Sequence, residues 1–233
     1  MARLGALALL DTVLDTGSRL SWDGPPLAVA EPGSPYAVEL AAAAASAGVD
    51  EAIITGEGRI KGRRIAFVAG EFRFLAGSIG RAAAERIVLA FERAQREDLP
   101  MFAAPSSGGT RMQEGTPAFL GMVKISAAVA SFKAAGLPYV VYLRHPTTGG
   151  VLASWGSLGH VTVAEPGATI GFLGARVYES LYGRPFPPGV QTAENLYERG
   201  ILDAIIPVER LADMASRILG ILDARHTDLP AVP

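Results

Sequence analysis

Cysteine is absent from the 233 residues, and histidine is scarce, with three copies. The missing cysteine excludes disulfides, thiolate nucleophiles and cysteine-ligated zinc. His145, His160 and His226 are far apart, and none lies in metal-ligand spacing with another histidine or with an acidic residue. We therefore expect that this chain binds no metal.

Neither sign of charge dominates the chain, since the net charge is −2 and acidic and basic residues are interspersed. No basic face indicates nucleic acid, and no acidic tail indicates a cationic partner. Residues 1–10 are apolar but carry Arg3, are about half as long as a membrane span requires, and show no cleavage pattern. We expect a cytoplasmic protein with no membrane or nucleic-acid partner.

Hydrophobic residues make up 49% of the chain, so it can bury a sizeable core. We expect one main domain over residues 36–224. Residues 1–35 combine a short helix over 4–13 with turn-forming Gly and Pro, and we predict an N-terminal arm that wraps the core or contacts a partner. The polar, proline-containing tail at 225–233 is predicted to be disordered.

Short apolar segments alternate with helical periods along the main domain. We expect strands at residues 51–55, 64–69, 101–104, 139–143, 160–164 and 168–172. Helices are expected at 41–47, 80–96 and 116–135 and after Gly150, and the first of them is alanine-rich, close-packed and ends at Gly48. This alternation favours an α/β fold with a mostly parallel sheet and right-handed crossovers.

A glycine-rich stretch lies at Gly56 to Gly62 between two of the expected strands. No helix follows it, so it matches neither a Walker A loop nor a dinucleotide-binding loop. A hairpin turn is the better explanation.

Two glycine pairs, Gly108-Gly109 and Gly149-Gly150, each follow a predicted buried strand and are separated by one helix and one strand. Neighbouring parallel strands would bring both loops to one edge of the sheet, where ligands bind in such folds. Glycine leaves backbone N–H groups unshielded, so the loops suit an oxyanion hole for a thioester carbonyl or an enolate. The alternative is that each pair only makes a tight turn before a helix.

Few side chains offer catalytic groups. Ser106 and Ser107 do not lie in the Gly-x-Ser-x-Gly elbow of a nucleophilic serine. Glu114 and Glu165 are candidate general bases, but a carboxylate near a helix start is more often a cap or a surface pair. Arg111 is a candidate for binding a phosphate or carboxylate through two hydrogen bonds, and its alternative is an ion pair with Glu114.

Six motifs between about residues 50 and 207 are shared with one known family. They are GEFRFLAGSIG at 70–80, SGGTRMQEG at 107–115, PTTGGV at 146–151, AEPGATIGF at 164–172, PPGVQTAE at 187–194 and GILDAIIP at 200–207. With them the chain resembles the carboxyltransferase β subunit of bacterial acetyl-CoA carboxylase, in the crotonase-like (ClpP/crotonase) superfamily. The resemblance implies a crotonase/ClpP-like fold of repeated strand-strand-helix units.

The resemblance implies a β-type subunit of a biotin-dependent acyl-CoA carboxylase. In that family, backbone N–H groups polarise the thioester carbonyl, so that an α-carbon enolate can take CO₂ from carboxybiotin. By analogy, Gly149 and Gly150 would form the oxyanion hole, with Gly108 and Gly109 as the adjoining wall. The residues it points to for substrate binding are Arg111, Gly77, Ser78 and Thr148.

The resemblance also implies partners. Acyl-CoA would be the substrate, and carboxylated biotin would arrive on a biotin carboxyl carrier protein. An α-type carboxyltransferase subunit of similar fold would complete the active site in an α2β2-type hetero-oligomer. On this view the chain alone is incomplete.

Departures from the family pattern leave the substrate open. The four-cysteine zinc ribbon is missing, so the roles assigned to it cannot be transferred. Ala76, Ile79 and Thr110 stand where the family usually has glycine, methionine and alanine, near the expected acyl pocket. A carboxylase of secondary metabolism that acts on another acyl-CoA is therefore an alternative to one that makes malonyl-CoA for fatty acid biosynthesis.

Three other functions remain as alternatives. The β subunit of a biotin-independent malonyl-thioester decarboxylase shares the fold and lacks the ribbon, but the intact motifs at 146–151 and 187–194 favour the carboxyltransferase. A crotonase-type hydratase or isomerase needs catalytic carboxylates, for which this chain offers only Glu114 or Glu165. A catalytically silent scaffold would keep the activity of its complex when Gly150 is replaced by a bulkier residue.

Overall fold

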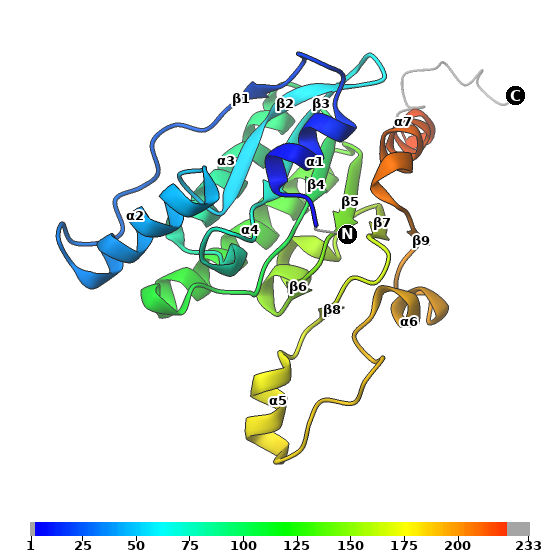
Figure 1. Cartoon of the computed structure of the whole chain (residues 1–233). Coiled ribbons are helices and arrows are strands. Elements are labelled where there is room, and N and C mark those ends of the chain that lie inside the picture. The colour runs from blue at the N-terminus through cyan, green and yellow to red at the C-terminus, as the bar shows by residue number, and fades with distance from the viewer. Residues whose placement is uncertain (1–2, 223–233) are drawn as a thin grey trace, which may run out of the picture.

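A seven-stranded sheet is the centre of the computed structural model, which describes residues 3–222 (Figure 1). Its order is β1-β2-β3-β4-β5-β7-β9. The strands are β1 Leu20–Ser21, β2 Ile53–Ile60, β3 Arg63–Gly70, β4 Met101–Ala104, β5 Tyr139–Leu143, β7 Val161–Ala164 and β9 Ala204–Ile205. The first three pair antiparallel and the rest are parallel, which confirms the expected α/β fold with a mostly parallel sheet.

The described part of the chain has seven α-helices. They are α1 Ala6–Val13, α2 Pro35–Ala47, α3 Arg81–Arg96, α4 Thr116–Ala134, α5 Ala175–Tyr182, α6 Ala193–Glu198 and α7 Leu211–Leu222. Of these, α3 and α4 cover one face of the sheet, and α1 and α7 cover the other. In β4, Met101 and Ala103 join the core formed with α3 and α4, whereas Phe102 and Ala104 join the core formed with α1 and α7. Successive strand residues point to opposite faces, so an apolar run is what a sheet covered on both sides requires.

The N-terminal stretch contributes to the core. Leu9, Leu10 and Val13 on α1 are buried against the sheet, and β1 extends the sheet at its edge. The boundary at residue 36 between an arm and a main domain stays a prediction. The tail predicted at 225–233 lies outside the described residues.

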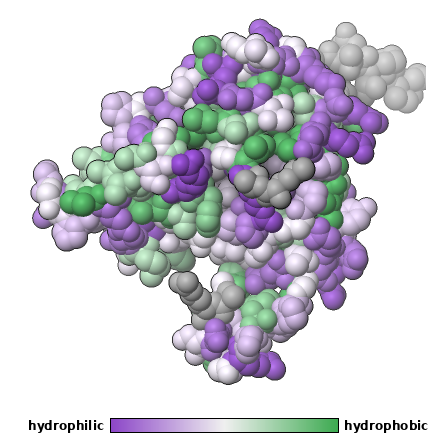
Figure 2. Space-filling view, viewed as in Figure 1, coloured by the Kyte–Doolittle hydropathy of each residue, from purple (hydrophilic) through white to green (hydrophobic). Residues whose placement is uncertain are grey.

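Helix α2 differs from its prediction in packing. It starts earlier than expected, where the Ser34 side chain accepts a hydrogen bond from the N–H of Ala37 (3.2 Å), and it ends at Gly48 as predicted. However, Ala43 is the only buried residue on its described length, so the expectation of a close-packed helix is wrong. Alanine favours the helix without needing burial, and hydrophobic surface is visible over α2 at the left of Figure 2.

The predicted hairpin joins β2 and β3. Its turn is shorter than the glycine-rich stretch, because only Lys61 and Gly62 form it, both with positive φ (49° and 81°). Gly56 lies inside β2, where a Cβ would approach the carbonyl oxygen of Leu20 on β1 to 2.2 Å. That glycine therefore allows the edge strand to pair.

A second, small sheet lies next to the main one. It pairs β6, Thr147–Thr148, with β8, Ile170–Gly171, in parallel. The strand expected at 168–172 is thus only two residues long, because this segment pairs with the loop after β5 instead of with the main sheet. The helix expected after Gly150 is present and continues as a π-helix at Leu152–Gly156.

Helix α4 is the one helix in the described part of the chain that is long and apolar enough to cross a membrane. It qualifies by its length and composition alone. Ile125, Val129 and Phe132 on α4 are buried in the core against α3, as in a core helix.

Candidate active site

The two glycine loops meet at one edge of the sheet, as their spacing predicts. β4 and β5 are parallel neighbours, so their carboxyl ends lie side by side. The Ser107 N–H donates to the carbonyl of Pro146 (2.6 Å), and the Thr148 N–H donates back to the carbonyl of Ser107 (3.1 Å). A Cβ on Gly149 would lie 3.9 Å from the Cα of Gly109. The backbones of the two loops are therefore in contact.

The two residues of the second pair, Gly149 and Gly150, differ in whether their N–H groups are already hydrogen-bonded. The Gly149 N–H donates to the carbonyl of Gly171 on β8 (2.9 Å), so it is already used within the fold. Gly150 is the first helical residue of its segment, and no acceptor in the described chain receives its N–H. First-turn donors have no partner within a helix. Of the two predicted oxyanion donors, the structure leaves only Gly150 open.

The first pair uses both of its N–H groups inside the loops. Gly108 donates to the carbonyl of Ala76 (2.9 Å), and Gly109 donates to Oγ of Ser107 (3.0 Å). These contacts suit the wall of the site, which was the role implied by the family resemblance, and they leave neither residue able to donate to a ligand.

Thr110 was not predicted as a donor, yet its backbone is placed like one. Ile79 pairs with both neighbours of Thr110, accepting from the N–H of Arg111 and donating to the carbonyl of Gly109 (both 2.9 Å). In a parallel bridge of this kind, the N–H of the residue between them points away. Within residues 3–222 that N–H has no acceptor, and Oγ1 of Thr110 lies 3.6 Å from a Cβ position on Gly150. No sequence signal distinguishes it, because any residue can offer a backbone N–H.

The residues predicted to bind substrate gather around the first pair. Gly77 has φ of 64°, and a Cβ there would lie 2.2 Å from the carbonyl oxygen of Ser106, so its loop packs tightly on the next one. Ser78 accepts hydrogen bonds from Arg111. Thr148 is half-buried and its Oγ1 donates to the carbonyl of Ser107 (3.3 Å). Their contact with a ligand stays a prediction.

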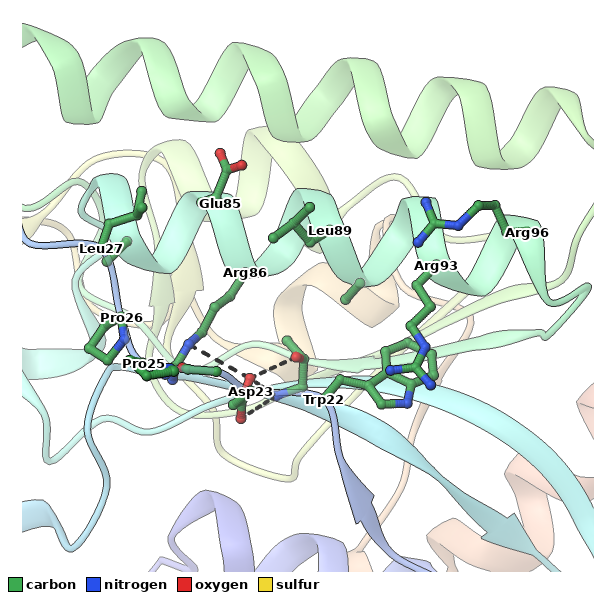
Figure 3. Close-up of a pocket in the computed structure, with 14 residues that line it drawn as sticks. Trp22, Asp23, Pro25, Pro26, Leu27, Glu85, Arg86, Leu89, Arg93 and Arg96 are labelled. Carbon is green, nitrogen blue, oxygen red and sulfur yellow. Dashed lines mark hydrogen bonds and ion pairs between the residues drawn. The ribbon is translucent and has the colours of Figure 1, made fainter.

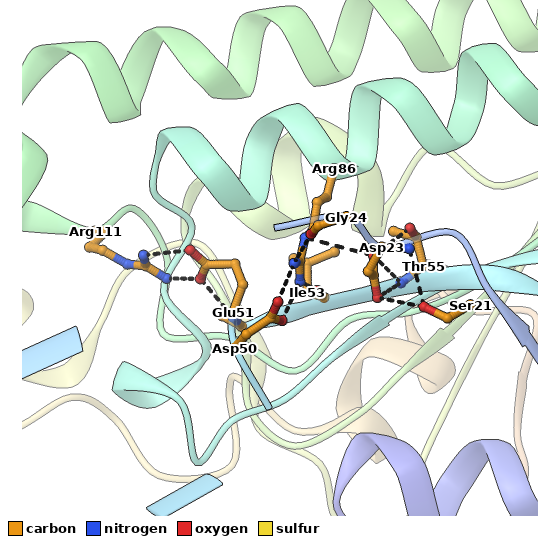
Figure 4. Close-up of polar contacts among 10 residues, drawn as sticks. Ser21, Asp23, Gly24, Asp50, Glu51, Ile53, Thr55, Arg86 and Arg111 are labelled. Atoms are coloured by element: carbon orange, nitrogen blue, oxygen red, sulfur yellow. Dashed lines mark hydrogen bonds and ion pairs between the residues drawn. The ribbon is translucent and has the colours of Figure 1, made fainter. Parts of the chain in front are cut away.

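Arg111 has a different role from the predicted one. Its side chain is fully buried and forms a bidentate pair with Glu51, which is 2% exposed (Figure 4). Burial opposes the charge, but the hydrogen bonds and charge of Glu51 outweigh it and raise the pKa of Arg111. With its guanidinium enclosed by protein, Arg111 cannot hold a phosphate or carboxylate of a ligand. The expected pairing partner, Glu114, is farther away, at 3.6 Å.

Both candidate general bases are held by backbone. The Glu114 carboxylate accepts from the N–H of Arg81 at the start of α3 (2.7 Å) and from the hydroxyl of Tyr36 (2.6 Å). Burial and this hydrogen bond raise the pKa of Tyr36 to about 12. Glu165 accepts from the N–H of His145 (3.0 Å). These contacts favour the capping and pairing roles that the sequence left as alternatives.

The described chain has no group of three or more His, Cys, Asp and Glu side chains that could hold a metal ion. The two described histidines each use Nδ1 to accept a backbone hydrogen bond. His145 accepts from Thr169 (3.1 Å) and His160 accepts from Tyr139 (3.0 Å).

A cavity of about 240 Å³ between the segment after β1 and helix α3 does not involve the glycine loops (Figure 3). Its polar groups largely satisfy each other. Asp23 accepts from the N–H and hydroxyl of Thr55 and lies 3.7 Å from Nε of Arg86, while Arg93 lies over the ring of Trp22. Burial raises the pKa of Asp23, against the opposing effect of the Thr55 hydrogen bonds.

A second cavity of about 420 Å³ lies beside the second glycine loop. It is lined by Ile170, Gly171 and Phe172 of the β8 segment together with Tyr178 and Tyr182 of α5. Phe172 and Tyr182 are largely exposed (64% and 60%), so this apolar wall is open to solvent in the isolated chain.

The mostly parallel sheet thus carries two glycine loops at its carboxyl edge, with the N–H of Gly150 open between them. The carboxyl transferase domain family matches residues 12–207, and this chain belongs to that family. Over 231 residues it is 63% identical to the probable biotin-dependent acyl-coenzyme A carboxylase beta3 subunit of Mycobacterium tuberculosis, covering 99% of this chain and 46% of that protein. The chain thus spans about half the length of this relative.

Other relatives support the same family. The acetyl-coenzyme A carboxylase carboxyl transferase subunit beta of Opitutus terrae is 39% identical over 233 residues, which cover 98% of this chain and 80% of the relative. Among solved structures, transcarboxylase 12S with hydrolysed methylmalonyl-coenzyme A has a TM-score of 0.78 at 21% identity, covering 93% of this chain and 42% of that one. A Pseudomonas malonate decarboxylase hetero-tetramer has a TM-score of 0.73 at 24% identity, covering 99% and 84%. These neighbours confirm the crotonase fold.

Proposed function

We propose that this chain is the β-type carboxyltransferase subunit of a biotin-dependent acyl-CoA carboxylase. The observation that carries the proposal is the open N–H of Gly150, which lies at the carboxyl edge of the sheet with no side chain of its own to cover it. The 63% identity to the mycobacterial acyl-CoA carboxylase subunit supports this assignment.

The open donor suggests how the chain would bind its substrate. The thioester oxygen of acyl-CoA would accept the Gly150 N–H, with the N–H of Thr110 as the second donor. Donors fixed in the fold and aimed at a developing negative charge stabilise an enolate more than a neutral carbonyl. The CO₂ would come from carboxybiotin on a carrier protein, with its N–carboxyl bond broken. The α-carbon would gain the carboxyl group and lose its proton, which would pass to the biotin nitrogen left by the CO₂.

The closed donors limit what this chain does alone. Gly108, Gly109 and Gly149 would shape the site and hold the Gly150 loop in place. An α-type subunit would then cover the acyl group and bring in carboxybiotin, in an α2β2-type assembly. The exposed apolar wall beside the second loop, at Phe172 and Tyr182, is consistent with such a partner.

The acyl group stays open. Thr110, Ala76 and Ile79 differ from the family pattern near the expected acyl pocket, and Oγ1 of Thr110 lies 3.6 Å from the Cβ position of Gly150. We propose an acyl-CoA, without restricting it to acetyl-CoA.

An assay of the purified complex with its α-type partner tests this function. One reaction contains acyl-CoA and carboxylated biotin, and the other contains malonyl-CoA alone. We expect carboxyl transfer that depends on biotin, in either direction. CO₂ release from malonyl-CoA without biotin would assign the chain to the decarboxylases instead, and inactivity across a panel of acyl-CoA substrates would favour a scaffold.

A further inference from the structure

A buried ion pair lies directly behind the glycine loops. Arg111 is 0% exposed and donates through both terminal nitrogens to Glu51, which is separated from β2 only by Ala52. Its Nη2 also donates to the carbonyl of Ser78 (2.7 Å), in the loop before α3. One guanidinium therefore ties the first glycine loop to two other segments.

The pair extends through Glu114, 3.6 Å from Nη1 of Arg111. Glu114 binds the backbone at the start of α3 and the hydroxyl of Tyr36 on α2. Gly80 shows how tightly this network is packed, since a Cβ there would lie 2.1 Å from Oε1 of Glu114 and 3.0 Å from Nη1 of Arg111. Any shift of these side chains would move the loop backbones with them.

The backbone of Arg111 also contacts the residues that form the site. The N–H of Arg111 donates to Ile79, and Ile79 donates to Gly109, so the residue between them is held from both sides. That residue is Thr110, whose side chain lies next to Gly150. Arg111 thus holds the donor region through its side chain and its main chain together.

We propose that the buried Arg111–Glu51 pair is a positioning device, which holds the backbone donors of the two glycine loops at the spacing that catalysis requires. It touches no substrate. Because the pair acts through loop geometry, it should govern the rate of the chemical step more than substrate affinity. Only the expected effect on the reaction rate rests on the proposed carboxyl transfer.

A second buried arginine of the chain provides a matched control. Arg86 is 8% exposed and binds both oxygens of Asp50 (2.8 and 2.7 Å), as well as the carbonyls of Ile53 and Gly24 (Figure 4). Its contacts join α3 to β2 and to the segment after β1, without touching either glycine loop. Removing the bidentate geometry of Arg86 should lower the stability of the fold about as much as the same change at Arg111. It should leave the position of the glycine loops unchanged.

The test compares Arg111→Lys with Arg86→Lys in the complex with the α-type partner. Lysine keeps the charge but loses the planar fork. A misplacement of about 1 Å can lower a rate roughly 10²-fold, so we expect kcat to fall by about that factor in Arg111→Lys, with KM for acyl-CoA changed less than about 3-fold. Arg86→Lys should keep kcat within about 3-fold by the same principle.

Amide hydrogen exchange on the same variants gives a readout that needs no activity. Peptides covering residues 75–80 and 106–115 should exchange faster in Arg111→Lys and remain unchanged in Arg86→Lys. If Arg111→Lys does not fold, Tyr36→Phe removes only the outer hydroxyl of the network, and it should also speed exchange in 106–115 and lower kcat more than it changes KM.

Equal kinetic losses in the two arginine variants, or unchanged loop exchange in Arg111→Lys, would overturn the inference. If the wild-type complex shows no carboxyl transfer with any acyl-CoA, the proposed function fails. The exchange comparison would still decide whether the pair positions the loops.

Discussion

The two glycine pairs look alike in the sequence but use their backbones differently. Both N–H groups of Gly108 and Gly109 are used inside the loops, and so is that of Gly149, whereas the N–H of Gly150 has no acceptor in the described chain. Steric room divides the glycines in another way, because Gly77 leaves no space for a Cβ while Gly150 does. A glycine can thus allow two backbones to approach closely, adopt a left-handed conformation, or leave its N–H exposed to a ligand. Only the third of these roles contributes directly to catalysis.

Replacing Gly150 by proline should have the largest effect. Proline removes the N–H, and it is tolerated at the first position of a helix, so the fold should persist. Loss of one oxyanion donor costs roughly 10²- to 10³-fold in kcat. Steady-state carboxyl transfer by the complex measures this loss.

Gly150→Ala is the control for that variant. A Cβ there meets Met122 Cγ at 3.4 Å and Oγ1 of Thr110 at 3.6 Å, which is close to ordinary contact. The N–H is kept, so kcat should stay within roughly 10-fold of wild type. The loss of an oxyanion donor would lower kcat by at least about 10²-fold. Equal losses in the alanine and proline variants would mean that space at this position matters and the donor does not.

Gly77→Ala should destabilise the fold most among these glycine variants. The new Cβ would lie 2.2 Å from the carbonyl oxygen of Ser106, and φ is 64°. Left-handed backbone and overpacking together should cost about 3 kcal/mol. Denaturant unfolding measures it, and an unchanged midpoint would show that the loop moves aside without strain.

Ser107→Ala should have an intermediate effect on stability. It removes the hydroxyl that accepts the N–H of Gly109, and Ser107 is 1% exposed. An unsatisfied buried donor costs about 1–3 kcal/mol. If the first pair is only a wall, the melting temperature should drop while kcat at a permissive temperature stays near wild type. A fall in kcat like that of Gly150→Pro would instead show that the first pair does more than line the site.

Gly108→Ala should have the smallest effect. Its backbone is outside the left-handed region, and the nearest atom to a Cβ is the carbonyl oxygen of Ala76 at 3.4 Å. The N–H is retained, so we expect a stability change within about 0.5 kcal/mol, as for an ordinary surface substitution. Thermal unfolding and kcat together check it, and a large change in either would contradict its assignment as a tolerant wall position.

Local pattern predicted most of the fold. The strands at 101–104 and 139–143 are fully buried apolar runs, and their order along the chain implies parallel neighbours. The strand at 168–172 was predicted, but β6 and its pairing with β8 were not, because β6 is two residues long and the pairing is set by tertiary contact. The packing of α2 was also misjudged, since an alanine-rich sequence supports a helix in either environment.

The sequence was enough to predict where the site lies, but not which backbone N–H groups are open to a ligand. Spacing was enough to bring Gly109 and Gly149 together. Which N–H groups stay open depends on acceptors such as Gly171, 22 residues beyond Gly149, which no local pattern reveals. The pairing of Arg111 with Glu51, 60 residues away, is invisible for the same reason.

The most direct test of the central claim is a crystal structure of this chain with the proposed α-type partner and a bound acyl-CoA. We predict that the thioester oxygen lies about 2.7–3.1 Å from the nitrogen of Gly150, the distance of an oxyanion-hole donor. The Gly149 N–H should still be bonded to Gly171. A thioester oxygen held by other groups, with the Gly150 N–H turned away from it, would contradict the account.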